Sequence, residues 1–139
     1  MVGLFSKNRQ HEVQSFMLKL VNNHCPELKR LAAGRRLESR VNLTLVVLVV
    51  PVERKRLLLA DRFTAITKEF TTRGVALVLH ECRAPDRVVL GFRWGEPMWW
   101  VLGESKHLSP LGGGFWQLGV HLEQMVYPDE YPGLESLYL

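Results

Sequence analysis

The chain has 139 residues, of which 47% are hydrophobic and 23% are charged, and its formal net charge is +4 at pH 7. This length suits one domain with short appendages, and the hydrophobic content excludes a generally disordered chain. The positive charge favours anionic partners, but basic and acidic residues are mixed, which argues against a dedicated binder of duplex DNA.

Neither a targeting segment nor a membrane span is visible in the sequence. The N-terminal stretch M-V-G-L-F-S-K-N-R has no apolar core followed by a cleavage site, so we expect no signal peptide. The longest apolar run, Val41–Val52, is much shorter than the roughly 20 residues that a spanning helix needs. Cys25 and Cys82 show no metal-type spacing and fit a reducing compartment. We therefore expect a soluble, cytoplasmic protein without membrane insertion.

The first third of the chain has a helical pattern. Apolar residues recur there at helical spacing, with polar residues between them: Val13, Phe16, Met17, Leu20 and Val21. Pro26 suits the first position of a second, short helix, and Gly34 is typical of the residue that ends one. We predict an N-terminal helical extension over residues 1–34.

From Val41 onward the sequence indicates β-structure. The predicted strands are Asn42–Val50, Leu57–Phe70, Val75–Leu79, Val88–Trp94, Met98–Leu102 and Phe115–Val126. Pro51 is expected to end the first strand, the charged residues 53–56 predict an exposed turn, and the proline and glycines of Lys106–Gly114 predict a loop. Short turns without intervening helices predict an antiparallel barrel over residues 35–127. The tail, residues 128–139, is expected to wrap the barrel or contact a partner.

Groups suited to an anionic ligand lie at the start of this β-region. Arg35, Arg36 and Arg40 occur in G-R-R-L-E-S-R, just before the first predicted strand. Guanidinium groups are always charged, present a planar fork of donors and stack on aromatic rings, so they suit both phosphate and guanine. A polar turn, E-F-T-T-R-G over Glu69–Gly74, joins two later strands. The arginines and this turn together favour a ligand that is anionic, flat and rich in hydrogen-bond acceptors.

These two segments resemble the PilZ domain, a family of bacterial receptors for cyclic di-GMP. The family has R-x-x-x-R before its first strand, and Arg36 and Arg40 match that motif. It has [D/N]-x-S-x-x-G near the following hairpin. Glu69, Thr71 and Gly74 match this second motif approximately, with a longer acid and with threonine in place of serine. The stretch G-F-W-Q-L-G-V-H-L resembles the closing strand of the family, so the resemblance extends over residues 35–126.

The resemblance implies an all-β fold: a six-stranded antiparallel barrel of PilZ type with a short N-terminal helical extension. It implies binding of cyclic di-GMP without catalysis, and a protein partner that responds when the ligand moves the N-terminal helices. The implied ligand residues are Arg35, Arg36, Arg40, Glu69, Thr71 and Gly74. Arg35 would face a second, stacked ligand molecule, or would instead cap the preceding helix. No metal or organic cofactor is implied.

Other interpretations stay open. The departures at Glu69 and Thr71 fit a PilZ-like interaction module that has lost nucleotide binding. A small enzyme or an RNA-binding barrel would need a catalytic set or an exposed aromatic strip, and the sequence shows neither. His80 and Cys82 share one face of a predicted strand, but two ligands do not make a metal site. The adjacent Trp99–Trp100 pair must point to opposite faces of its strand, and we expect packing rather than base stacking.

Replacing Arg40 tests the arginine motif. We expect Arg40→Ala to weaken cyclic di-GMP binding at least about tenfold, because a charge-assisted hydrogen bond is worth roughly 1.5–3 kcal/mol. The melting temperature should stay nearly unchanged. Isothermal titration calorimetry of the parent, Arg36→Ala and Arg40→Ala measures the effect; equal affinities in all three would show that these arginines are surface charge with no part in binding.

Overall fold

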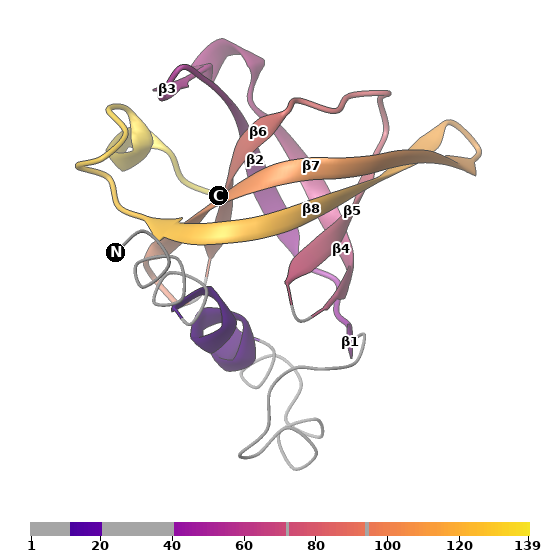
Figure 1. The fold of residues 1–139 in the computed structure, drawn as a ribbon, viewed down its shortest axis with the longest axis horizontal. Helices are drawn as coiled ribbons and strands as arrows, with labels where there is room; N and C mark the ends of the chain where they lie inside the picture. Colours follow the sequence, from indigo (N-terminus) through magenta and orange to yellow (C-terminus); the bar gives the residue numbers. More distant parts are fainter. Residues whose placement is uncertain (1–11, 21–40, 72, 94) are drawn as a thin grey trace, which may run out of the picture.

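The computed structural model describes residues 12–20, 41–71, 73–93 and 95–139. Residues 12–20 form an α-helix, and most of the rest is β-structure (Figure 1). The strands are β1 (Val41–Asn42), β2 (Val46–Glu53), β3 (Arg56–Leu57), β4 (Phe63–Phe70), β5 (Gly74–Leu79), β6 (Arg87–Arg93), β7 (Met98–Gly112) and β8 (Phe115–Val126). Short 3-10 helices follow β3, at η1 (Leu59–Asp61), and β8, at η2 (Leu134–Ser136).

Six strands form a closed antiparallel barrel, as predicted. The strand order is β1-β4-β5-β8-β7-β6-β2-β3, and β4 also pairs with β2. This additional pairing runs from Val46 with Ile66 to Val49 with Phe63, and it joins the two ends of the sheet. β1 and β3 have two residues each and pair only with the ends of β4 and β2. The barrel strands are therefore β2, β4, β5, β6, β7 and β8.

Alternating apolar side chains fill the barrel, and the N-terminal helix covers part of it (Figure 1). On β5 and β8 the buried inward residues are Val75, Leu77, Leu79, Leu118, Val120 and Leu122. The ring centroid of Phe16, on the helix, lies 5.6 Å from that of Phe92 and 5.8 Å from that of Trp99. Val13, Met17 and Leu20 are also buried. Within residues 12–20, the apolar residues that recur at helical spacing in the sequence thus form the face of the helix that packs on the barrel.

The C-terminal tail packs on the outer surface of the barrel. Tyr131 and Leu134 are buried there in a second apolar cluster that includes Trp100. Trp99 packs instead against the main core, so the two tryptophans point to opposite faces, as predicted. Gly91, the register partner of Trp100, leaves room for the indole, because a Cβ at residue 91 would lie 2.5 Å from a ring atom. The tail therefore wraps the barrel, which is one of its two predicted roles.

The prediction of a loop over Lys106–Gly114 is wrong. β7 continues to Gly112, and only Gly113 and Gly114 form the turn to β8, with φ values of 62° and 85°. The pairing of β7 with β6 ends at Glu104, whereas its pairing with β8 continues to Gly112. Pro110 is therefore tolerated, because proline is compatible with a strand that has a neighbour on one side. Pairing with β8 has overridden the local turn signals.

Two other strand boundaries also differ from the prediction. β2 passes through Pro51 and ends at Glu53, and the Pro51 carbonyl accepts a hydrogen bond of 2.8 Å from the N–H of Leu58. The predicted strand Leu57–Phe70 is interrupted by η1, because Leu57 and Leu59 turn to pack on the cluster beneath the tail. The exposed turn at residues 53–56 is confirmed, with φ values of 52° at residue 54 and 63° at residue 55.

Truncation of Leu134 tests whether the tail is an integral part of the fold. Leu134 is 1% exposed, so Leu134→Ala should lower the free energy of unfolding by about 2–5 kcal/mol through lost burial and a cavity. Leu111→Ala is the matched control, because Leu111 is 43% exposed and should change stability by no more than about 0.5 kcal/mol. Urea denaturation measures both; equal small effects would show that the tail contributes little to stability.

Candidate functional site

Three predicted ligand residues lie together on the outside of the barrel. Glu69 near the end of β4, Thr71 after it and Gly74 at the start of β5 all line one open groove of about 270 Å³. The other residues lining it are Arg73, Val75, Ala76, Lys106, Gln117, Gly119, Val120 and His121. The remaining predicted ligand residues, Arg35, Arg36 and Arg40, lie outside the described residues. The structure thus brings the second motif together with groups from β7 and β8.

A β-bulge gives Glu69 its place in the groove. In β4 the residues facing the core alternate as Phe63, Ala65 and Thr67. The register with β5 then shifts between Thr67 and Glu69, which inserts one extra residue in β4. Such a bulge changes the direction of the following side chains. As a result, Phe70 is fully buried in the core and Glu69 faces the groove.

The turn between β4 and β5 is held by its own polar groups. The N–H of Thr71 donates to the carbonyl of Gly74 at 2.9 Å, and the Thr71 hydroxyl lies 3.4 Å from the same oxygen. The carbonyl of Arg73 accepts a hydrogen bond of 2.8 Å from the N–H of Leu122 on β8. The motif threonine therefore helps to close the turn, and the turn itself is anchored to the neighbouring strand.

A buried threonine connects the start of the barrel to β4 through hydrogen bonds. Thr67 is 1% exposed; its hydroxyl donates to the carbonyl of Leu43 at 2.6 Å and accepts from the N–H of Leu45 at 2.8 Å. Because buried polar groups need partners, these bonds hold the connection between β1 and β2 against β4. Thr67 was not predicted as a site residue, although its inward place in the alternation of β4 was a usable signal.

β1 lies directly beside the second motif. Asn42 pairs with Glu69, and Val41 pairs with Phe70. In the sequence, Val41 immediately follows Arg40, the last residue of the arginine motif. The part of the chain that follows the arginine motif therefore begins next to the groove.

Small residues form the floor of the groove between β5 and β8. Ala76 pairs with Gly119, and Gly74 pairs with His121. The φ of Gly74 is not positive, so its backbone conformation does not require glycine. The close approach of β8 does require glycine, because a Cβ at residue 74 would lie 2.5 Å from the carbonyl oxygen of Val120. At Gly119 the nearest atom would be 3.8 Å away, so a methyl group fits there.

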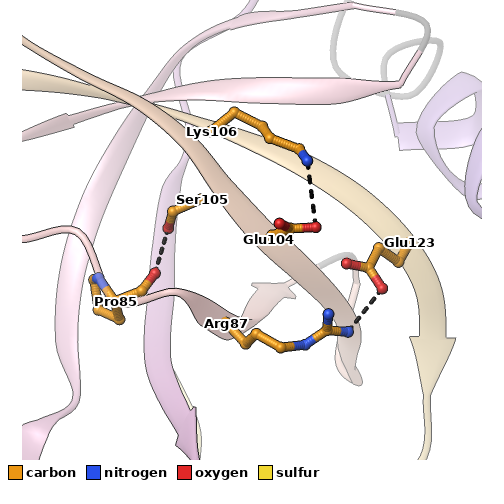
Figure 2. A network of polar contacts seen from close by, with 6 residues as sticks. All are labelled: Pro85, Arg87, Glu104, Ser105, Lys106 and Glu123. Atoms are coloured by element: carbon orange, nitrogen blue, oxygen red, sulfur yellow. Dashed lines mark hydrogen bonds and ion pairs between the residues drawn. The ribbon is translucent and has the colours of Figure 1, made fainter.

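Basic side chains surround this floor. Arg73 comes from the turn, Lys106 from β7 and His121 from β8, while Glu69 is the acid that lines the groove. The Lys106 ammonium forms an ion pair of 3.3 Å with Glu104, whose side chain is on the same strand (Figure 2). Cations concentrated on one open surface attract anions, and acceptor-rich anions in particular. The groove can therefore hold a phosphate-bearing ligand.

Polar contacts fix the strands next to the groove. Arg87 of β6 donates to Glu123 of β8 at 2.7 Å, across the intervening β7 (Figure 2). Ser105 of β7 bonds the loop before β6 through its hydroxyl, which donates to the carbonyl of Pro85, and through its N–H, which donates to that of Asp86. These bonds hold β7 in place just before Lys106.

Lys106 and His121 were not predicted as site residues. Lys106 fell within the predicted loop, and His121 was one of five scattered histidines. The alternation of β8 offered a signal for His121, because Leu118, Val120 and Leu122 face the core and the residues between them must face outward. No local pattern could have placed Lys106 in the same groove as Glu69, because this depends on how β7 pairs with β8.

The expected common strand face of His80 and Cys82 is not seen. β5 ends at Leu79, both residues are exposed, and His80 lies 3.8 Å from Glu81. Among residues 12–20, 41–71, 73–93 and 95–139, no cluster of three or more His, Cys, Asp or Glu side chains could hold a metal ion. Within the same ranges, no helix has the length and apolar character needed to cross a membrane.

Comparison with models of known families and with curated proteins finds no match for the sequence. The structure is similar to a solved one, that of the Bacillus subtilis inhibitor of motility (MotI/DgrA), with a TM-score of 0.48 and 12% sequence identity. The similarity covers 69% of this chain and 48% of that protein, so this chain spans about half of its length.

The two floor glycines give a matched test of the close approach between β5 and β8. Gly74→Ala should lower the free energy of unfolding by about 1–3 kcal/mol, because the new methyl group overlaps a backbone oxygen. Gly119→Ala should be neutral or stabilise by about 0.4–1 kcal/mol, because the methyl group fits and the unfolded chain loses freedom. Equal effects in thermal and urea unfolding would contradict the structural role of Gly74.

Proposed function

We propose that this chain is a PilZ-type receptor module that binds cyclic di-GMP in the groove and acts through a protein partner. One observation carries the proposal: the second motif, with Glu69, Thr71 and Gly74, lines a groove rich in basic groups that lies beside β1, which immediately follows the arginine motif in the sequence. The function is binding without catalysis. No metal or organic cofactor forms part of it.

The chemistry of the groove suits the parts of this ligand. Arg73 and Lys106 supply positive charge for phosphate, and the small residues Gly74, Ala76 and Gly119 leave room for a purine ring on the floor of the groove. The Glu69 carboxylate is an acceptor, as is required for the N–H donors of a guanine edge. By the resemblance, Arg36 and Arg40 add further phosphate contacts, and Arg35 serves a second, stacked molecule.

The size of the groove fits a shared site. Its volume of about 270 Å³ is slightly below the roughly 300–1,000 Å³ of typical ligand pockets. In the proposal, the groove supplies one side of the site and the arginine motif supplies the other. A ligand held by both would connect the barrel to the segment that links it to the N-terminal helix.

The proposed output is a change in the N-terminal region that a protein partner detects. The helix of residues 12–20 packs on the barrel through Phe16, Phe92 and Trp99, and the arginine motif lies between this helix and β1 in the sequence. Ligand contacts with the motif would shift the packing of the helix. A cytoplasmic location belongs to the proposal, and the exposed thiol of Cys82 is consistent with a reducing compartment.

A second candidate is a PilZ-like interaction module without nucleotide binding. It is favoured by the structural roles of two motif residues: Thr71 closes its own turn, and Gly74 allows β8 to approach. Both residues would have a part in the fold even if no ligand bound. The two candidates differ in whether the groove binds cyclic di-GMP.

Titration with cyclic di-GMP by isothermal calorimetry tests the proposal. The parent should bind, and Glu69→Asp with Thr71→Ser should tighten binding by about 1 kcal/mol or more, because the shorter acid and smaller hydroxyl match the family pattern. Arg73→Gln should weaken binding roughly three- to tenfold through loss of a charged contact.

Arg62→Gln is the matched control, because Arg62 is exposed and lies just before β4, at the opposite end of that strand from Glu69. The affinity of the Arg62→Gln protein for cyclic di-GMP should equal that of the parent. Absence of binding in the parent and in the Glu69→Asp/Thr71→Ser protein would overturn the receptor proposal and favour the interaction module.

A further inference from the structure

We propose that Glu104 is an internal competitor of the ligand: it neutralises Lys106, and the ligand must displace it to use that lysine. This inference rests on the proposed binding of cyclic di-GMP in the groove. It assigns Lys106 to the ligand and gives Glu104 the role of limiting affinity. Neither residue belongs to the motifs identified in the sequence.

The geometry of β7 places the two side chains together. Residues two apart in a strand share a face, and the Lys106 Nζ lies 3.3 Å from Oε2 of Glu104. The register partners on β8 are Val120 for Ser105 and Gly119 for His107, so Lys106 is the extra residue of a bulge. Lys106 lines the groove, and Glu104 lies opposite His121, another lining residue.

The ion pair is suited to exchange. The Lys106 and Glu104 side chains are 54% and 42% exposed, so water screens their attraction and the pair contributes little to stability. A phosphodiester matches a carboxylate in carrying one negative charge and two free acceptor oxygens, and it can therefore replace Glu104 as the partner of Lys106 in so exposed a pair. The bound ligand would then lie close to a carboxylate that it has displaced.

The neighbouring acids do not share this role. Glu123 already accepts a hydrogen bond of 2.7 Å from Arg87, which Figure 2 shows on the side of Glu123 away from Lys106. Glu69 lines the groove itself, where the proposed function assigns it to the guanine edge. The described contact between an acid and a basic groove residue that the ligand would break is thus that of Glu104 with Lys106.

A double-mutant cycle tests this competition, with cyclic di-GMP as the probe in calorimetric titrations. Glu104→Gln should tighten binding about three- to tenfold, because it frees Lys106 for the ligand. Lys106→Met should weaken binding at least about threefold through loss of a cation. In the Lys106→Met background, Glu104→Gln should change the affinity less than about twofold, because there is no lysine left to release.

Glu53→Gln is the matched control for net charge. Glu53 is exposed at the end of β2, does not line the groove, and its replacement should leave the affinity unchanged. Melting temperatures check that every variant is folded.

Each outcome decides between the proposals. If the parent binds and Glu104→Gln binds no tighter, or if its gain persists without Lys106, the competition is overturned while the proposed function stands. If none of the folded variants binds, the proposed function fails and the competition fails with it.

Discussion

The pairing of β2 with β4 is the interaction on which the rest of the structure depends. It joins the two ends of the sheet, so the apolar faces of six strands enclose a common interior. An open sheet would leave two edges with unpaired backbone groups and one apolar face in water. Closure leaves an end for the N-terminal helix to cover with Phe16, and an outer apolar face for the tail to cover with Tyr131 and Leu134.

The groove arises where one barrel strand departs from regular alternation. The bulge in β4 turns Glu69 outward and returns Phe70 to the core, while Thr67 holds the preceding connection in place. A regular strand would have continued the inward series to residue 69 and buried a carboxylate, which is unfavourable without a partner. The same local irregularity therefore keeps the core apolar and provides the acid of the candidate site.

Structural roles and proposed ligand contacts overlap in the second motif. Gly74 permits close contact with β8, and Thr71 closes the turn, so both contribute to the fold whether or not a ligand binds. The charges around the groove differ in this respect. Arg73 and Lys106 have exposed side chains, and the ion pair of Lys106 is weak in water. Their grouping beside a small-residue floor is the part of the site that packing alone does not explain.

The sequence by itself determined the fold class, the six barrel strands, the helical face within residues 12–20 and the common origin of Glu69, Thr71 and Gly74 in one turn. These features depend on local periodicity and turn chemistry, which act between residues close in the chain. Only the tertiary structure decided the length of the β7–β8 hairpin, the bulge before Glu69 and the place of Lys106 and His121 in the groove. Those features depend on which strand lies alongside and in which register. Pairing with a neighbouring strand can override the turn signals of Pro110 and Gly112, and no pattern within β7 alone contains that information.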